Sequence, residues 1–479
     1  MEYEIVIGLE IHAELKTGSK IFCGCKNEFG DEPNTSCCPV CLGMPGTLPV
    51  LNKKALEYAV KAGLAMNCQI SKFSKMDRKN YFYPDMPKAY QISQYDMPIC
   101  YDGFVNIETG DEMKRIGIER IHLEEDAGKL IHDARGEGSM IDYNRCGVPL
   151  IEIVTRPDVR TPEEARSLFE TVKSILEYTG VSDCRMQEGS IRADVNLSIR
   201  PRGREDFGIR TEMKNINSLR AVERAAAAEA KRQAEVLDQG GTVVQETRRW
   251  DDNKGESFSM RSKEEAMDYR YFPEPDLVPI VVEDAWISEI KSSIPELPQR
   301  RKKRYIEKLG IPAYDANLIT MNKLVSDIFE AAAETCGNPK LASNWVMTEL
   351  LCRVNEKGES VLNSGLTGEK LGEILLFLER GEITQTSANT VLDVLIETGE
   401  KPQAIIEHLD LKIQKDENLI AGKIHEILKE NPRAVMDYAA GKEKAFGFLM
   451  GKSMTALKGK GHPALVRETL TRELQLYLK

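Results

Sequence analysis

The feature that most constrains the fold of this 479-residue chain is a change of pattern between Ile294 and Pro298. Before it, apolar and polar residues alternate in short runs separated by glycine-rich polar loops, which is typical of β-strands. After it, apolar residues recur at helical spacing, and a further small helical unit begins near Pro402. The sequence therefore predicts an α+β protein with a largely antiparallel sheet domain at residues 1–292, an all-α domain at 293–403 and a small helical tail at 404–479.

The composition indicates an ordinary globular protein. Hydrophobic residues make up 41% and charged residues 29% of the chain, which are usual values for folded domains. The formal net charge of −11 argues against a protein that coats nucleic acids without specificity, although a local basic patch can still bind RNA. The opening residues MEYEIVIGLE do not resemble a signal peptide, and no apolar run is long enough to span a membrane. We therefore expect a cytoplasmic protein without membrane contact.

Five of the eleven cysteines fall within residues 22–43, in a loop-like stretch rich in Gly, Asn and Pro. Cys23-x-Cys25 and Cys38-x-x-Cys41, with twelve residues between them, have the spacing of a structural zinc site with four thiolate ligands. Cys37 could replace Cys38 as a ligand. A redox Cys-x-x-Cys pair and five unligated thiols are the alternatives. The remaining cysteines stand alone and are expected to be reduced thiols: Cys68, Cys100, Cys146, Cys184, Cys336 and Cys352.

Several predicted strands of the first domain carry polar side chains on one face and apolar side chains on the other. In GLEIHAEL, alternation with a period of two places Glu10, His12 and Glu14 on one face. In HLEEDAG, Glu124 and Glu125 point to opposite faces if the strand is regular, and which of them faces a metal stays open. The same alternation gathers Asp194, Asn196 and Ser198 of IRADVNLSIRP, and Arg210, Glu212 and Lys214 of GIRTEMKNIN.

These polar faces concentrate carboxylates beside a histidine and several cations. Carboxylate oxygens are the ligands that Mg²⁺ prefers, and Lys and Arg stabilise the charge of transferring phosphate oxygens. Any one strand is equally consistent with the solvated face of an antiparallel sheet. The set as a whole favours a site for Mg²⁺ and phosphate, which does not compete with the cysteines because zinc prefers softer ligands.

Two further stretches bear on nucleotide binding. The run from Gly447 to Ser453 has three residues between its glycines where a P-loop needs four, so any ATP site is of another kind. Residues 76–96, MDRKNYFYPDMPKAYQISQYD, interleave cations with tyrosines around two prolines. Cations for phosphates and flat rings for bases suit a nucleotide or the end of a single-stranded RNA. Ordinary packing of tyrosines is the alternative.

Long stretches of the sequence resemble the B subunits of the tRNA-dependent amidotransferase GatCAB. The resemblance extends over nearly the whole chain and is carried by GLEIHAEL, DRKNYFYPDMPKAYQISQYD, HLEEDAG, VPLIEIVT, DYRYFPEPDL and AFGFLMGKSMTALKGKGHP. It implies a cradle-like kinase domain, a helical domain and a small tail similar to YqeY. These three parts agree with the three patterns along the sequence.

The resemblance also implies a reaction. The family phosphorylates the side-chain carboxylate of misacylated Glu-tRNA(Gln), Asp-tRNA(Asn) or both with ATP, and ammonia converts the acyl phosphate into Gln-tRNA(Gln) or Asn-tRNA(Asn). Phosphorylation supplies the leaving group that a carboxylate lacks. No Gly-Ser-rich amidase signature occurs in this chain, so ammonia is expected from an amidase A subunit, which a small C subunit tethers. The sequence does not decide between the two tRNA substrates.

Residue roles follow from the matching motifs. The implied Mg²⁺ ligands are Glu10, His12, Glu124 and Glu125, and together with Lys79 they are the predicted catalytic residues. The cysteines match zinc-bearing members of the family, while other members lack them, which favours a structural zinc. The predicted nucleotide-binding residues are Lys79, Tyr81, Tyr83, Ser190, Asp194, Glu212 and Lys214.

The C-terminal residues 441–479 contain eight Lys or Arg and three Glu, and within the family this tail is the expected contact with tRNA. Lys452, Lys458 and Lys460 are the predicted tRNA-binding residues, with a solvated helix face as the alternative. A different hypothesis is a non-catalytic, tRNA-binding scaffold subunit. In a scaffold, changing Glu10, His12 and Glu125 would leave catalysis intact.

Overall fold

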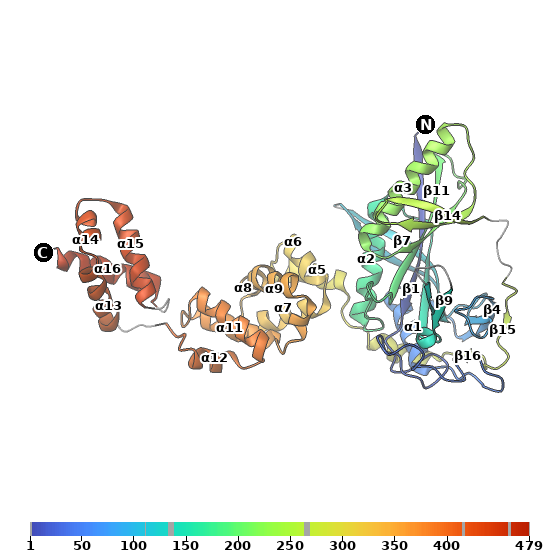
Figure 1. The fold of residues 1–479 in the computed structure, drawn as a ribbon, viewed down its shortest axis with the longest axis horizontal. Coiled ribbons are helices and arrows are strands. Elements are labelled where there is room, and N and C mark those ends of the chain that lie inside the picture. The colour runs from blue at the N-terminus through green and yellow to red at the C-terminus, as the bar shows by residue number, and fades with distance from the viewer. Residues whose placement is uncertain are drawn as a thin grey trace. The chain divides into compact units, whose positions relative to one another are not determined.

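The structure of the protein is a computed structural model that describes residues 2–110, 112–132, 138–262, 269–413, 417–457 and 461–478. The chain divides into two compact units, Met1–Leu297 and Pro298–Lys479 (Figure 1). The first unit combines sheets with helices, and the described part of the second is helical. The predicted α+β class, with a helical C-terminal region, is confirmed. Among the described residues, no helix has the length and apolar character needed to cross a membrane.

A nine-stranded sheet forms the first unit, in the order β14-β13-β12-β11-β1-β10-β7-β6-β2. Each neighbouring pair is antiparallel except β12 and β13, which are parallel. The predicted largely antiparallel sheet is therefore confirmed. Its strands are β1 (Tyr3–Glu14), β2 (Gln69–Ile70), β6 (Cys100–Thr109), β7 (Glu112–Glu125), β10 (Pro149–Thr155), β11 (Ile191–Pro201), β12 (Thr211–Ile216), β13 (Glu246–Asp251) and β14 (Glu256–Ser262).

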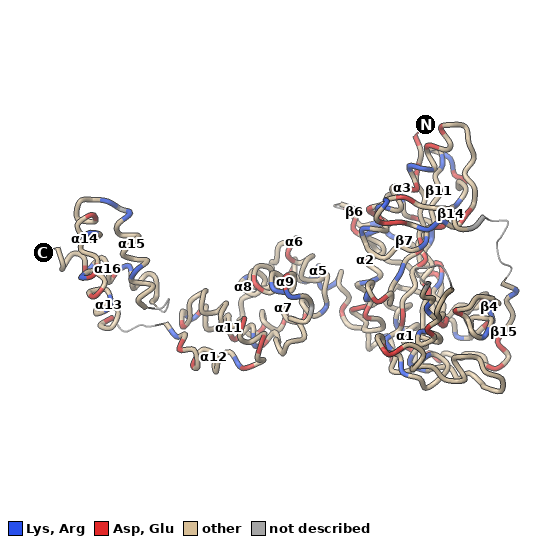
Figure 2. The backbone as a smooth tube through the Cα atoms, in the orientation of Figure 1, with Lys and Arg blue, Asp and Glu red and all other residues tan. Residues whose placement is uncertain are grey.

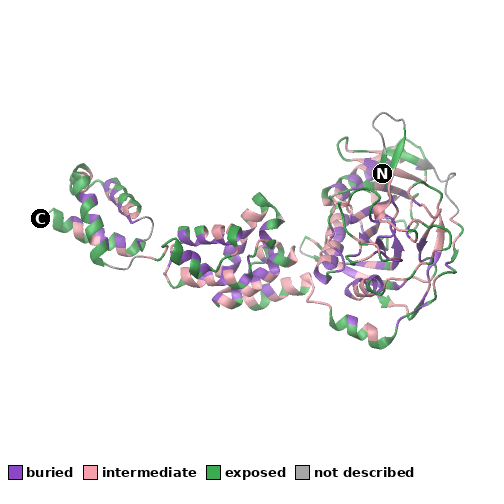
Figure 3. Ribbon diagram, turned by 60° about the horizontal axis from the view of Figure 1, so that its bottom comes forward, coloured by how far each residue is buried: buried purple, intermediate pink, exposed green. Residues whose placement is uncertain are grey.

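Alternation along these strands separates the core of the unit from its polar face. On β1, Ile7, Leu9 and Ile11 are at most 1% exposed and belong to one hydrophobic core (Figure 3). The helices α1 (Lys53–Ala65), α2 (Pro162–Thr179) and α3 (Leu219–Asp238) contribute their apolar faces to the same core. The other face of the sheet is left to the polar side chains of the alternating pattern, as the sequence predicts.

The helices begin and end at recognisable capping residues. In α2, the Thr161 side chain accepts a hydrogen bond from the backbone N–H of Glu164, Pro162 occupies the first turn, and Gly180 ends the helix with φ +70°. In α3, Ser218 caps the backbone N–H of Ala221 in the same way. These local signals define where both helices begin and where α2 ends.

Three small sheets complete the first unit. They are β15 (Phe272–Pro273) with β4 (Asp77–Asn80) and β5 (Tyr90–Ser93), β16 (Ile280–Val281) with β3 (Phe73–Ser74), and β8 (Lys129–His132) with β9 (Ser139–Asp142). A 3-10 turn covers Tyr143–Arg145, and α4 (Asp284–Ser292) lies near the end of the unit. Arg78 of β4 donates to both carboxylate oxygens of Glu274, at 2.7 and 2.8 Å. This pairing brings the tyrosine-rich residues 76–96 next to residues 269–277, YRYFPEPDL.

The second unit contains two separate hydrophobic cores in its described part, one from Tyr305 to Ile406 and one from Ile420 to Leu474. Gly368 and Gly372 of α10 allow close packing on α7, because an added Cβ would lie 2.5 Å from Ala331 and 2.4 Å from Thr335. A π-helical segment, Val346–Leu350, and a 3-10 segment, Glu359–Asn363, adjoin α9. The α-helices are α5 (Pro298–Leu309), α6 (Ala313–Thr320), α7 (Lys323–Cys336), α8 (Pro339–Trp345), α9 (Leu351–Lys357), α10 (Gly368–Glu379), α11 (Gln385–Thr398), α12 (Pro402–His408), α13 (Glu417–Glu430), α14 (Pro432–Ala439), α15 (Glu443–Ala456) and α16 (Pro463–Tyr477).

Candidate functional site

The register of the large sheet assembles a row of charged side chains from four strands. His12 of β1 lies opposite Arg192 of β11 on one side and Glu152 of β10 on the other, and Glu152 lies opposite His122 of β7. Figure 2 shows acidic and basic residues close together around β7 and β11. The site therefore depends on cross-strand pairing between residues that are far apart in the sequence.

His12, Glu124 and Glu152 form the centre of this row, with one ligand atom from each within 4.8 Å of the others. His12 Nε2 is 3.4 Å from Glu152 Oε2 and 4.0 Å from Glu124 Oε1. His122 Nε2 approaches the same carboxylates, at 3.2 Å from Glu152 Oε2 and 3.6 Å from Glu124 Oε2. Ser93 of β5 donates a hydrogen bond to Glu124 Oε2 at 3.2 Å. We call His12, Glu124 and Glu152 the central acid–histidine group.

Opposite charges stabilise each other within this group. Burial lowers the pKa of His122, but Glu152 and Glu124 outweigh burial and raise the pKa to about 9. Burial alone raises the pKa of Glu152, yet the two imidazoles hold it well below its ordinary value. The Nδ1 atoms of both histidines are buried without a hydrogen-bond partner among the described residues. Glu152 is thus kept ionised inside a largely desolvated site.

The central acid–histidine group fits a divalent cation. Two carboxylates supply the hard oxygen ligands that Mg²⁺ prefers, and one imidazole adds a nitrogen. The three side chains leave further positions for water or phosphate oxygens. Glu152 was not among the predicted ligands. Its sequence signal is weak, because VPLIEIVT reads as an apolar strand with a single acid, and only the register opposite His12 shows its place.

Glu10, Asp194 and Glu212 form a second set of carboxylates within 4.8 Å of one another. Lys214 Nζ lies between them, 2.9 Å from Asp194 Oδ2 and 3.0 Å from Glu212 Oε1. Asn196 Nδ2 donates to Glu10 Oε1 at 3.0 Å. Burial, Glu152 and Glu212 raise the pKa of Glu10, and Lys214 partly offsets them. An ammonium group already pairs with two of these three acids, so we call the set the lysine–carboxylate cluster; it lies beside the central group.

Lys79 approaches the central group from the three-stranded sheet. Its Nζ lies 4.8 Å from the centroid of the Tyr269 ring. Burial lowers the pKa of Lys79, but the charges of Glu124 and Glu152 raise it above the ordinary value. The side chain therefore supplies a positive charge directed at the two acids. The Tyr81 and Tyr83 rings stack nearby, with centroids 5.9 Å apart.

Glu125 lies away from both carboxylate sets. Its side chain is 2% exposed and pairs with Lys88 Nζ, and its Oε1 accepts a hydrogen bond from the backbone N–H of Ile92 at 2.8 Å. Glu124, by contrast, points to the central group. The structure therefore brings His12 and Glu124 together, puts Glu10 in the neighbouring cluster, and leaves Glu125 with Lys88.

Ser190 lies at the start of β11 and closes a turn. Its Oγ accepts from the backbone N–H of Arg185 at 2.6 Å and donates to Asp183 Oδ1 at 3.0 Å.

The other residues predicted to bind nucleotide lie at two borders of the central group. Lys79, Tyr81 and Tyr83 occupy the β4 border, whereas Asp194, Glu212 and Lys214 occupy the β11–β12 border.

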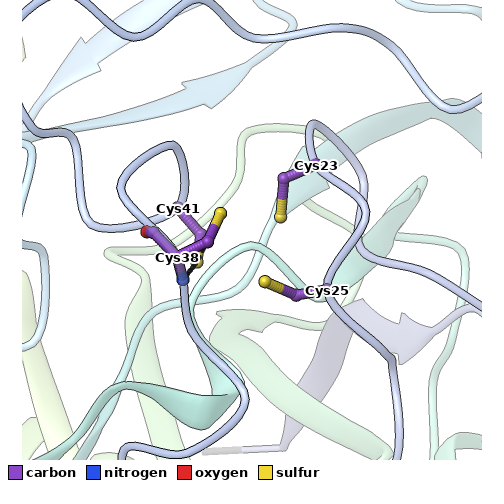
Figure 4. Close-up of side chains that lie close together, drawn as sticks. All are labelled: Cys23, Cys25, Cys38 and Cys41. Carbon is purple, nitrogen blue, oxygen red and sulfur yellow. Dashed lines mark hydrogen bonds between the residues drawn. The ribbon is translucent and has the colours of Figure 1, made fainter.

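The sulfur atoms of Cys23, Cys25, Cys38 and Cys41 point into one common space (Figure 4), and all four lie within 4.8 Å of one another. The Sγ atoms of Cys38 and Cys41 are 4.0 Å apart, close to the roughly 3.8 Å edge of a tetrahedron with 2.3 Å Zn–S bonds. The four residues therefore fit a zinc ion of closed coordination, with no open position for catalysis. Cys37 lies outside the group, since its Sγ contacts the Asn34 carbonyl oxygen at 3.3 Å.

Three neighbours stabilise negative charge on Cys41. A hydrogen bond from Cys23 lowers the pKa of Cys41 to about 5. The backbone N–H of Cys38 donates to Cys41 Sγ at 3.1 Å, and the fully buried Lys20 ammonium lies 3.8 Å from the same sulfur. A four-cysteine site needs thiolates. The surrounding favours a thiolate at Cys41, whereas the hydrogen bond with Cys41 raises the pKa of Cys23 and burial raises the pKa of Cys25.

Of the predicted tRNA-binding lysines, Lys452 is described, and Lys458 and Lys460 lie outside the described residues. Lys452 is exposed on α15, with its Nζ 5.8 Å from the centroid of the Phe448 ring.

Comparison with known proteins adds to this geometry. The model of the GatB/GatE catalytic domain matches residues 5–288, and the model of the GatB domain matches residues 327–474. The chain is similar to the B subunit of the aspartyl/glutamyl-tRNA(Asn/Gln) amidotransferase of Caldicellulosiruptor bescii, at 58% identity over 99% of this chain and all of the relative. The corresponding B subunits of Thermoanaerobacter sp. and Carboxydothermus hydrogenoformans are 56% and 50% identical, again over 99% of this chain and at least 99% of each relative. The chain therefore belongs to the family of B subunits of aspartyl/glutamyl-tRNA(Asn/Gln) amidotransferases, components of ligases that form a carbon–nitrogen bond.

Proposed function

We propose that this chain carries the kinase-like step of a tRNA-dependent amidotransferase. The side-chain carboxylate of misacylated Glu-tRNA(Gln) or Asp-tRNA(Asn) attacks the γ-phosphorus of ATP, and the bond from that phosphorus to the bridging oxygen of ADP breaks. Ammonia then attacks the acyl carbon of the acyl phosphate. Hydrogen phosphate leaves with one proton from ammonia, and the product carries a side-chain amide.

The observation that supports this proposal is the central acid–histidine group with a lysine at each border. Lys79 and Lys214 bring positive charge toward a site where phosphate oxygens gain charge in the transition state. His12, Glu124 and Glu152 would hold Mg²⁺ there, and the ion would neutralise phosphate oxygens when bound. Residues that position phosphates account for most of the rate enhancement in phosphoryl transfer.

The cysteine group has a separate role in the proposal. Cys23, Cys25, Cys38 and Cys41 would hold a structural Zn²⁺ that fixes the loop of residues 22–43. A four-thiolate site leaves no position for substrate, so the reaction does not pass through it.

The partners are also proposed. An amidase A subunit supplies ammonia, a small C subunit tethers it, and tRNA(Gln) or tRNA(Asn) contacts the helical tail. Because Lys452 is exposed on α15, Lys452→Ala is expected to weaken tRNA binding and to reduce the slope of log K against log salt by about 1. An unchanged salt slope would exclude Lys452 as a phosphate contact. The cytoplasmic location stays a prediction.

The test of the catalytic proposal is ATP hydrolysis by the reconstituted complex with Glu-tRNA(Gln), with every ammonia donor withheld. Phosphate release should require the tRNA and disappear with Glu124→Gln. Glu119→Gln, an exposed acid on the same strand, is the matched control and should leave release unchanged. Release that is indifferent to Glu124→Gln would favour the non-catalytic, tRNA-binding scaffold and place the kinase site on a partner.

A further inference from the structure

Five tyrosine rings lie at the β4 border of the central group in two neighbouring runs, and we call Tyr81, Tyr83, Tyr95, Tyr269 and Tyr271 the tyrosine shelf. Tyr81 stacks on Tyr83 at 5.9 Å, Tyr269 meets Tyr271 edge-on at 6.1 Å, and Tyr271 stacks on Tyr95 at 4.3 Å, as measured between ring centroids. The backbone N–H of Asn80 donates to the Tyr269 carbonyl at 3.0 Å, which holds the two halves of the shelf together. Residues about 190 positions apart in the chain thus share one aromatic surface.

The tyrosine shelf begins at the proposed reacting centre and extends toward solvent. Lys79 Nζ lies over the Tyr269 ring, and burial raises the pKa of Tyr271, with Glu124 and Glu152 adding to the shift. At the outer end, Tyr83 is 50% exposed and Tyr95 is 60% exposed. Rings this exposed contribute little to a core and remain available to a ligand.

The lysine–carboxylate cluster lies on the opposite side of the central group. The shelf meets the central group beside β7, which carries Glu124, and the cluster extends to β12. Counting from β7 through β10, β1 and β11, these two strands are four spacings, or about 19 Å, apart. In phosphoryl transfer the attacking and leaving oxygens lie roughly in line through the phosphorus. With the γ-phosphate at the centre, ATP occupies one border and the acyl acceptor must arrive from the other.

The two borders differ in what they offer to a ligand. The β11–β12 border presents Lys214 among carboxylates and amides, which suits one polar nucleotide. The tyrosine shelf presents a series of rings with Lys79 alongside, and successive unpaired bases stack on successive aromatic side chains. Resting on the proposed function, we infer that the tyrosine shelf binds the unpaired 3′ end of the acyl-tRNA, starting with its terminal adenosine, and that ATP approaches from the β11–β12 border.

An adenosine on the tyrosine shelf could come from tRNA or from ATP, and equilibrium binding separates the two. The probes are an uncharged tRNA(Gln) transcript, the same transcript without its 3′-terminal adenosine, and a non-hydrolysable ATP analogue, each titrated into the assembled complex. Tyr83→Ala and Tyr95→Ala are the test variants. Tyr101→Ala, which removes an exposed tyrosine of β6, is the matched control.

We expect each test variant to weaken binding of the complete transcript by about 5- to 100-fold, the range of one base–aromatic stack. For the shortened transcript, the same substitution should weaken binding by less than about half of the factor found for the complete transcript. The affinity for the ATP analogue should not change. Tyr95→Phe keeps the ring and should bind like the parent, which separates stacking from loss of fold. Tyr101→Ala should leave all three affinities as they are.

Two results would overturn the inference. If the substitutions weaken binding of the ATP analogue and leave the affinity for the tRNA transcript unchanged, the tyrosine shelf binds the adenine of ATP instead. Unchanged binding of all three probes would leave the rings as packing only. Because the titrations need no turnover, failure of ATP hydrolysis would count against the proposed function and not against this inference.

Discussion

The cysteine group and the central acid–histidine group both gather potential metal ligands within 4.8 Å, but they are assembled in opposite ways. The four cysteines come from one loop of about twenty residues, so their spacing is visible in the sequence. His12, Glu124 and Glu152 come from three strands of the large sheet, and their proximity depends on strand order and register. Local sites can be predicted from spacing, whereas sites across a sheet need its topology.

The two groups also differ in how their negative charge is stabilised. In the cysteine group, negative charge on Cys41 is stabilised by hydrogen bonds from Cys23 and the Cys38 backbone and by one buried ammonium group from Lys20. The acids are stabilised by two imidazoles and by Lys79. The first arrangement suits a closed, permanent site, and the second keeps positions for substrates.

The largest effect is expected from Glu152→Gln. The substitution keeps the shape of the side chain and removes a carboxylate between His12 and His122, so tRNA-dependent ATP hydrolysis should fall by about 10²–10³-fold, as for loss of one preorganised stabilising group. Zinc content should stay unchanged, because the cysteines are a separate group. Activity within a few-fold of the parent would mean that Glu152 is not part of the reacting site.

Glu152 also shows what the sequence alone could not provide. The alternation in GLEIHAEL placed Glu10 and His12 on one face, and the structure agrees. The face of Glu125 could not be decided from HLEEDAG. Of two consecutive acids in a strand, one points to each face, whichever way the alternation runs. The pairing of β10 with both β1 and β7 decides that Glu124 and Glu152 meet at His12. No residue spacing carries that information.

The next largest effect is expected from Cys38→Ser, with Cys37→Ser as the matched control. Cys38→Ser removes a member of the cysteine group, so the purified protein should lose its zinc and more than about 2.7 kcal/mol of stability, the contribution of a ligand at 100 times its Kd. Cys37→Ser changes a sulfur outside the group and should keep both. Elemental analysis and thermal unfolding measure the two properties. Loss of zinc in Cys37→Ser alone would reverse the ligand assignment.

Glu125→Gln is expected to lower stability and to leave hydrolysis largely unchanged. Lys88 and Glu125 are 8% and 3% exposed, and removing one partner of a buried ion pair costs about 3 kcal/mol. The unfolding temperature should therefore fall, while the rate of ATP hydrolysis per folded molecule stays close to that of the parent.

Glu124→Gln is the matched comparison one residue away. Its side chain is also buried and pairs with His12 and His122, so its unfolding temperature should fall as well, but only this variant should lose hydrolysis. If Glu125→Gln abolishes hydrolysis with its unfolding unchanged, Glu125 acts at the reacting site as the family resemblance implied.

The smallest effect is expected where the two regions meet, at Gly147. Its φ of +78° lies in the left-handed region, and its carbonyl oxygen accepts from the backbone N–H of Ile21 at 2.9 Å. A Cβ at this position would lie 3.4 Å from the Cys41 Cβ, an ordinary contact, so Gly147→Ala should cost only the backbone strain of about 1–2 kcal/mol. Because Gly147 also leads into the strand that carries Glu152, the variant tests whether the two groups are coupled. Normal hydrolysis with a lowered unfolding temperature is expected, because strain in the loop weakens the fold and leaves the register of β10 in place. A matching fall in hydrolysis would show that the cysteine loop positions the acids.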